Sequence, residues 1–210
     1  TPYDTYRLLS QSPLLDQVPW QIVHFFWGDE RWVVPSDPRS NESMARKALL
    51  DHIPVAEDQI HPIYQAGLSA EEAAIAYDQF LRRFFIGEPH LFDLVFLGLG
   101  ENGHTASLFP HTPVLQRTNH WVEEVFPPGQ DLFRITLTAD VINRSALVVC
   151  MVSGSNKADI LQKVLEAPSN PEELPAQLIQ PENGELLWIV DEAAAQKLSG
   201  TGRRTQGTIR

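Results

Sequence analysis

The sequence has 210 residues, of which 43% are hydrophobic, 16 are Lys or Arg and 27 are Asp or Glu. The formal net charge of −11 argues against nucleic acid or an anionic membrane as a partner. The single cysteine, Cys150, excludes an intrachain disulfide and a thiolate zinc site, and its apolar neighbours predict a buried, inert thiol. No signal peptide or membrane-spanning run is recognisable, so we expect a cytoplasmic protein.

Segments rich in β-branched and aromatic residues alternate with helical patterns along the chain. We expect strands at residues 20–26, 92–99, 133–137, 146–152 and 186–190. Several of these segments are almost continuously apolar, which is typical of strands buried on both faces of a sheet. Ligands of such sheets bind at the edge where the parallel strands end.

Helical spacing of apolar residues predicts helices over residues 41–52, 69–85 and 155–166. A serine opens each pattern, and Ser69 with Glu72 forms a capping box. The alternation predicts an α/β fold with a mostly parallel sheet flanked by helices. We expect one domain over residues 1–198, a surface loop at 167–177 and a disordered tail over 199–210.

Three glycines, Gly98, Gly100 and Gly103, follow the strand predicted at 92–99 and match the pattern GxGxxG. Dinucleotide binding needs a long helix after this motif, whereas Pro110 restricts any helix here to residues 104–109. No suitable acid at the end of a second strand follows about 20 residues later. We therefore expect neither a nicotinamide or flavin nor any other cofactor.

The same glycines predict a tight turn that approaches a ligand closely, followed by a short helix that begins at His104. The free N–H groups of a helix start favour an anion or a developing oxyanion and disfavour imidazolium. His104 is then expected to be neutral near pH 7 and able to act as a base. A capping or structural histidine is the alternative interpretation.

Two further clusters carry charge at predicted strand ends. Residues 28–31 read GDER, in which Asp29 could orient a hydroxyl or water and Arg31 could bind an anion; a surface salt-bridged turn is the alternative. Residues 153–157 repeat the glycine turn and end in Lys157, which is tolerable at a helix start if an anionic ligand lies beside it. Lys157 could equally be a surface lysine. Arg134, within a predicted strand, could face the same edge, and no histidine has metal-ligand spacing, so no metal is expected.

Segments in one order along the chain resemble the 6-phosphogluconolactonase family. They are GDERWVVPSDPRSNESMARKALL at 28–50, FDLVFLGLGENGHTASLFP at 92–110, RITLT at 134–138, VSGSNKADIL at 152–161 and LPAQLIQP at 174–181. The resemblance extends to about Leu198 and implies a Rossmann-like fold shared with glucosamine-6-phosphate deaminase and ribose-5-phosphate isomerase A.

The resemblance also implies an activity, that of a carboxylic ester hydrolase. The expected reaction is hydrolysis of 6-phospho-D-glucono-1,5-lactone to 6-phosphogluconate, the second step of the oxidative pentose phosphate pathway, without a metal. The expected partner is the phosphorylated sugar lactone alone, and a monomer is expected. A sugar-phosphate-binding module without catalysis and a glucosamine-6-phosphate deaminase or isomerase are the alternatives.

Site residues follow from the same resemblance. His104 would deprotonate the attacking water, Asp29 would orient the histidine or sugar hydroxyls, and N–H groups of residues 103–105 would stabilise the oxyanion. The residues expected to bind the substrate or its phosphate are Thr1, Arg31, Gly100, Asn102, Gly103, Thr105, Arg134 and Lys157.

The chain departs from the related patterns at several positions. Of the family's Gly-Gly-Ser-Thr-Pro phosphate loop only Thr1 and Pro2 match, so the preceding strand and the loop glycines are expected to lie outside this sequence. Asn102 stands where related sequences usually have aspartate, and asparagine provides no charge to the histidine. Phe109 stands where the deaminases have a carboxylate, which favours the lactonase.

Overall fold

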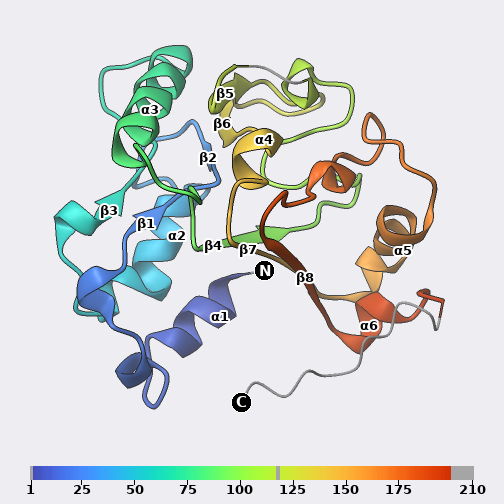
Figure 1. Ribbon diagram of the computed structural model, residues 1–210, viewed down its shortest axis with the longest axis horizontal. Helices are drawn as coiled ribbons and strands as arrows, with labels where there is room; N and C mark the ends of the chain where they lie inside the picture. Colours follow the sequence, from blue (N-terminus) through green and yellow to red (C-terminus); the bar gives the residue numbers. More distant parts are fainter. Residues whose placement is uncertain (1, 117–118, 200–210) are drawn as a thin grey trace.

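Parallel strands lie at the centre of the molecule and helices cover both faces, as the alternating pattern predicts (Figure 1). The computed structural model describes residues 2–116 and 119–199. The helices are α1 (Pro2–Leu9), α2 (Asn41–Ala48), α3 (Ala70–Phe84), α4 (Ala139–Ile142), α5 (Ala158–Glu166) and α6 (Glu192–Ala195). The strands are β1 (Phe25–Phe26), β2 (Asp29–Arg31), β3 (Ile60–His61), β4 (Leu94–Gly98), β5 (Val122–Val125), β6 (Arg134–Leu137), β7 (Leu147–Val152) and β8 (Glu185–Val190).

Three parallel strands in the order β4-β7-β8 form the central sheet, with Gly98 opposite Met151 in the register. Helix α1 covers one face, where the Tyr6 ring meets Phe96 edge-on at a centroid distance of 6.5 Å. Helix α5 covers the other face, where Leu161 packs with Val152. The α/β class with parallel strands between helices is thereby confirmed, and both glycine turns follow strands of this sheet at its carboxyl edge.

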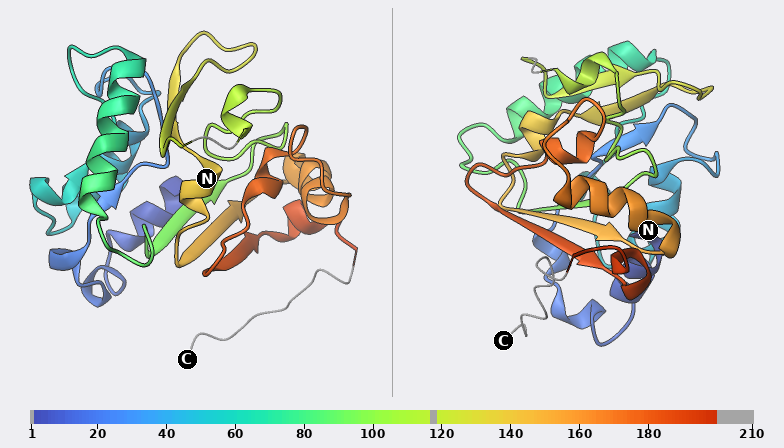
Figure 2. Two further views of the ribbon diagram at one scale, coloured as in Figure 1. Left: turned by 45° about the horizontal axis from the view of Figure 1, so that its top comes forward. Right: turned by 90° about the vertical axis from the view of Figure 1, so that its right-hand side faces the viewer.

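A separate antiparallel sheet carries two of the charged segments. Its order is β2-β6-β5, and Asp29 on β2 lies opposite Thr136 on β6 while Arg31 lies opposite Arg134. Figure 2 shows this sheet above the parallel strands, toward the side of α3. The strand predicted at 133–137 therefore exists but runs antiparallel to its neighbours. The pairing brings the GDER segment and Arg134 together.

Local capping explains why the predicted helices form. The Ser40 hydroxyl accepts from Ser43 N–H at the start of α2, and the Ser69–Glu72 capping box closes the start of α3. Helix α2 is shorter than predicted because Leu49, with φ −141° and ψ −62°, leaves the helical region before a short 3-10 helix, Leu50–His52. The segment predicted as a loop, 167–177, is irregular except where the 3-10 helix Pro175–Leu178 begins.

The strand predicted over residues 20–26 is mostly wrong. Residues 20–22 form a 3-10 helix and only Phe25–Phe26 pair as a strand, because the Gln59 side-chain amide donates to the carbonyls of Trp20 and Val23. These distant hydrogen bonds take the place of a sheet partner. Cys150 is buried as predicted, and burial raises the pKa of its thiol to about 12.

Two expectations meet the limits of the described residues. No helix among residues 2–116 and 119–199 has both the length and the apolar character needed to cross a bilayer. The predicted tail lies outside the described residues from Gly200 onward, whereas Ser199 N–H donates to Glu166 at 2.6 Å.

Candidate active site

His104 lies in a tight turn directly after β4, not in a helix. The helix predicted over residues 104–109 is wrong, since Ala106 has a φ of 47°, outside the helical region. The Thr105 hydroxyl donates to the Gly98 carbonyl at 2.8 Å, and Gly100 N–H donates to the His104 carbonyl at 2.8 Å. These hydrogen bonds give the backbone an alternative to a helical turn.

The turn uses N–H groups that sequence reasoning assigned to an oxyanion. Gly103 N–H donates to the Gly100 carbonyl at 3.0 Å, and His104 N–H donates to Asn102 Oδ1 at 3.3 Å. Thr105 is only 2% exposed, and its hydroxyl is the one bound to Gly98. The turn therefore does not present a helix start to a ligand.

Gly100 and Gly103 shape the turn around the histidine. A Cβ on Gly100 would collide with the His104 ring, so only glycine lets the imidazole lie against the backbone there. Gly103 has a φ of 82°, and its carbonyl accepts from Ala176 N–H at 2.9 Å. The two glycines are thus explained by ring packing and backbone conformation.

Asn102 holds the His104 ring in one tautomer. His104 Nδ1 lies 2.5 Å from Asn102 Oδ1, and the same oxygen accepts from His104 N–H. An amide oxygen can only accept, so Nδ1 carries the proton and Nε2 is left with its lone pair. Asparagine thus orients the imidazole, although it adds no negative charge.

His104 is half-buried and its imidazole is kept neutral. Burial of the ring is the main reason why the pKa of His104 is lowered to about 4. The positive charges of Arg134, Lys157 and Arg31, in this order, act in the same direction. The Phe109 ring stacks on the imidazole with 4.1 Å between ring centroids. The predicted neutral histidine is therefore present, but burial and cations replace the helix start as its cause.

Arg134 is held in place on several sides. Its side chain is 14% exposed, and its guanidinium lies 5.4 Å from the centroid of the Phe109 ring. The Nη1 atom lies 3.8 Å from Asp29 Oδ2, while Nε and Nη2 donate to Gln130 Oε1 at 3.1 and 2.7 Å. One cation therefore lies between an acid, an amide and the ring that covers His104.

Asp29 bonds to other residues rather than to the histidine. Its Oδ2 accepts from the Ser107 hydroxyl at 2.7 Å, and its Oδ1 accepts from Asn41 Nδ2 at 3.4 Å. Asn41 also donates to the Asp29 carbonyl at 2.8 Å, which fixes the backbone of β2 to the start of α2. The carboxylate therefore orients Arg134, and Asn102 orients His104.

Glu30 and Arg31 join the same strand to α2. The Glu30 carboxylate is 2% exposed and accepts from the N–H groups of Arg31, Asn41 and Glu42 at 2.7 to 2.8 Å. Burial raises its pKa, while these backbone hydrogen bonds oppose the rise. Arg31 Nη1 donates to the Arg39 carbonyl at 2.7 Å. The GDER segment is thus a buried helix cap and not a surface turn.

Lys157 ends the 3-10 helix Ser155–Lys157 that follows β7. Its turn is tied to the His104 turn by Asn156 Nδ2, which donates to Glu101 Oε1 at 2.6 Å. Asp191 accepts from Ser153 Oγ at 2.7 Å and from Gly154 N–H at 3.0 Å. Among the described residues, the Lys157 ammonium has no hydrogen bond or ion pair within the chain. This cation remains available to a ligand.

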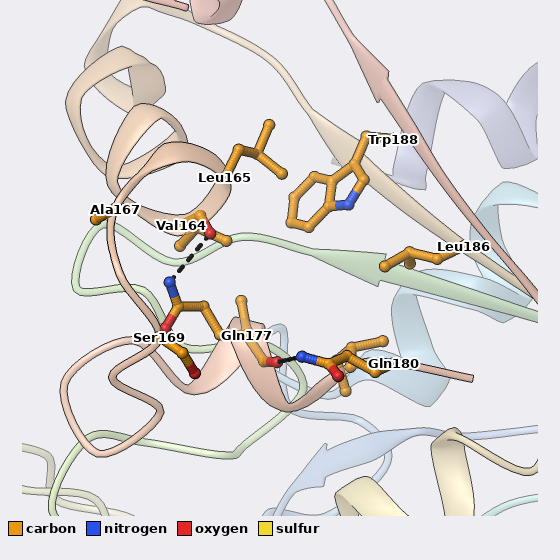
Figure 3. Close-up of a pocket in the computed structure, with 10 residues that line it drawn as sticks. Val164, Leu165, Ala167, Ser169, Gln177, Gln180, Leu186 and Trp188 are labelled. Atoms are coloured by element: carbon orange, nitrogen blue, oxygen red, sulfur yellow. Dashed lines mark hydrogen bonds between the residues drawn. The ribbon is translucent and has the colours of Figure 1, made fainter. Parts of the chain in front are cut away.

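A cavity of about 560 Å³ opens beside these residues, and Asn102, Phe109 and Gln130 form part of its wall. This volume lies in the range of small-ligand sites. A smaller pocket of about 230 Å³ lies elsewhere, between α5, the 3-10 helix Pro175–Leu178 and β8, and contains none of the predicted site residues (Figure 3). In that pocket Gln177 Nε2 donates to the Val164 carbonyl at 3.2 Å.

The sequence prediction and the structure agree on most of the charged groups. Arg31, Arg134 and Lys157 all act electrostatically on His104, which brings three distant segments together. Thr1 lies outside the described residues. Sequence reasoning missed Ser107, Asn41 and Gln130, because their roles depend on sheet pairing and turn geometry. Among the described residues, no group of three or more His, Cys, Asp and Glu side chains could hold a metal ion.

Comparison with known proteins agrees with this site. The family model described as "Glucosamine-6-phosphate isomerases/6-phosphogluconolactonase" matches residues 1–188. The chain is 41% identical over 201 residues to the 6-phosphogluconolactonase of Synechocystis, covering 94% of this chain and 81% of the relative.

Solved structures show the same likeness. A protein named devB matches with a TM-score of 0.86 at 30% identity, covering 94% of this chain and 83% of that one. The 6-phosphogluconolactonase of Trypanosoma brucei matches with a TM-score of 0.81 at 28% identity, covering 94% and 82%. A monomeric glucosamine-6-phosphate deaminase, at 22% identity and a TM-score of 0.76 over 93% and 83% of the two chains, shares the fold. From the model match and these relatives, the chain belongs to the glucosamine-6-phosphate isomerase/6-phosphogluconolactonase family.

Proposed function

We propose that this chain hydrolyses 6-phospho-D-glucono-1,5-lactone to 6-phosphogluconate, with His104 as the general base. The observation that carries the proposal is the neutral imidazole whose Nδ1 is bound by Asn102 at 2.5 Å and which three cations surround. Relatives at 41% identity that are 6-phosphogluconolactonases support the substrate.

Nε2 of His104 would take a proton from water as the water oxygen bonds to C1 of the lactone. Collapse of the tetrahedral intermediate would break the bond between C1 and the ring oxygen, and the imidazolium would return the proton to that oxygen. The products are the C5 hydroxyl and a carboxylic acid that ionises in water. A positioned base of this kind contributes roughly 10²–10⁴ to the rate.

The cations would serve the negative charges of the reaction. Arg31 and Lys157, together with Arg134, would bind the substrate phosphate. Their field would also stabilise negative charge that develops at the C1 oxygen, because the site is partly desolvated. The same field lowers the pKa of His104, so bound phosphate would partly restore the basicity of the imidazole.

Asn102 and Asp29 would have separate orienting roles. Asn102 would keep the proton on Nδ1 so that Nε2 can accept one from water. Asp29 would hold Arg134 and offer its remaining lone pairs to sugar hydroxyls. Neither role requires a charge on residue 102.

The test is hydrolysis of freshly prepared lactone, with the spontaneous rate subtracted, by the wild type, His104→Ala and His52→Ala. His52 is an exposed histidine at the end of α2 and serves as the matched control. We expect His104→Ala to lose turnover by about 10²-fold or more while still binding 6-phosphogluconate. His52→Ala should retain the wild-type rate.

Turnover that survives in His104→Ala, with only weakened ligand binding, would contradict the role of His104 as base. Ammonia release from glucosamine 6-phosphate by the wild type would favour a deaminase. Phe109 argues against that outcome, since it stands where a carboxylate is expected in a deaminase.

A further inference from the structure

The loop between β5 and β6 contains a tight turn that its sequence encodes. Gln130 N–H donates to the Pro127 carbonyl at 3.2 Å, and Gly129 between them has a φ of 73°. Proline at the second position and glycine with positive φ at the third are the signature of a type II β-turn. Residues 127–130, Pro-Pro-Gly-Gln, therefore fix where Gln130 leaves the backbone.

Aromatic packing fixes the two ends of this loop. The rings of Phe126 and Phe133 meet edge-on at a centroid distance of 5.0 Å, directly outside the strand residues Val125 and Arg134. Pro127 is buried, while Gln130 is half-buried and lines the 560 Å³ cavity. The loop thus delivers one amide side chain to the cavity from a restrained backbone.

The Gln130 amide oxygen binds one edge of the Arg134 guanidinium. It accepts from Nε at 3.1 Å and from Nη2 at 2.7 Å, which uses two of the five N–H groups of the arginine. The opposite nitrogen, Nη1, faces Asp29 Oδ2 at 3.8 Å, and Phe109 supports the flat face. The remaining N–H groups of Nη1 and Nη2 form the edge that can bind an anion.

We propose that Gln130 is a positioning residue that acts through Arg134 to hold this anion-binding edge in the cavity. The inference rests on the proposed function in one respect, that Arg134 binds the anionic group of the substrate. An arginine held at one edge and one face loses less side-chain freedom on binding an anion, so its contribution to affinity is larger. Gln130 itself contributes no charge.

Calorimetric titration of the full chain with inorganic phosphate tests this role without turnover. Gln130→Met keeps the length of the side chain and removes the acceptor, and we expect it to weaken phosphate binding about fivefold. Gln21→Met, at an exposed glutamine in the 3-10 helix Trp20–Ile22, is the matched control and should bind as the wild type does. Melting temperatures of all variants report folding separately.

A double-mutant cycle distinguishes positioning from direct contact. If Gln130 acts through Arg134, then Gln130→Met in an Arg134→Ala background should change the phosphate dissociation constant by less than about 1.5-fold. In lactone hydrolysis, Gln130→Met should raise KM and leave kcat within about twofold. A kcat loss of the same size as the KM change would contradict a role in binding.

Each remaining outcome decides one proposal. Wild-type phosphate affinity in Gln130→Met, or an equal loss in the Arg134→Ala background, would overturn the positioning role and leave the lactonase proposal intact. A fivefold phosphate effect in a chain that does not accelerate lactone hydrolysis would refute the lactonase proposal and leave the positioning role. Phosphate that does not bind the wild type would overturn both, since both require an anion at Arg134.

Discussion

The two glycine turns at the carboxyl edge of the parallel sheet follow the same pattern and differ in how they are held. The turn after β4 is closed by its own residues, with Gly100 N–H on the His104 carbonyl and Asn102 on the imidazole. The turn after β7 is held from outside, by Asp191 and by the Glu101–Asn156 hydrogen bond. The first turn thus presents an oriented, uncharged base, and the second presents an unpaired cation.

The largest expected effect comes from disturbing the self-contained turn. In Gly100→Ala the new methyl group would collide with the His104 ring, so the imidazole must move. We expect kcat/KM for the lactone to fall by about 10²-fold, the usual cost of a displacement of this kind. Steady-state kinetics measure the loss, and phosphate binding measured by calorimetry should remain. Loss of both would mean that the two turns are not independent.

The externally held turn should respond in KM. Lys157→Ala removes the free ammonium, and we expect KM to rise about tenfold with kcat little changed, because the lost contact is to a charged group. Lys47→Ala, at an exposed lysine of α2, provides the matched control. An unchanged KM in Lys157→Ala would make Lys157 a surface lysine.

The pH profile should distinguish the role of Asn102 from that of an aspartate. With a His104 pKa of about 4, the imidazole is neutral above that pH, so kcat/KM should be flat from about pH 5 to 7 and fall below. In Asn102→Asp the added negative charge favours imidazolium and raises this pKa. The acid limb should therefore move to higher pH, and an unmoved limb would show that another group controls it.

The smallest effect is expected where the two turns meet. Glu101→Gln keeps an oxygen that can accept from Asn156 and removes the charge, while Glu101→Ala removes both. The KM of Glu101→Ala should exceed that of Glu101→Gln by about two- to threefold, as for loss of an exposed hydrogen bond. Equal KM values in the two variants would mean that this contact does not hold Lys157.

Local signals predicted much of the fold. Serine caps and apolar spacing predicted α2, α3 and α5, and the apolar runs predicted β4, β7 and β8 to within a few residues. These elements are buried and regular, so tertiary contacts reinforce the local preference. Because parallel strands end at one edge, His104 and Lys157 could also be assigned to a common site.

The failures come from side chains that bond to the backbone over a distance. Gln59 took the carbonyls of Trp20 and Val23 and prevented a strand, and Thr105 bonded to Gly98 and prevented a helix at His104. The antiparallel pairing of β2 with β6, which places Arg31 opposite Arg134, has no local signal in a strand of three residues. Tertiary hydrogen bonds override local preference at these places.

The buried carboxylate of Glu30 makes one wall of the cavity a cooperative unit of local unfolding. Because it caps α2 and also binds the N–H of Arg31, the first turn of the helix cannot fray without releasing the strand that carries Asp29 and Arg31. The amides of Asn41 and Glu42 should then exchange with solvent deuterium only when this wall opens. A ligand held by Arg31 would slow their exchange from a distance, so protection of a helix start would report occupancy of the cavity.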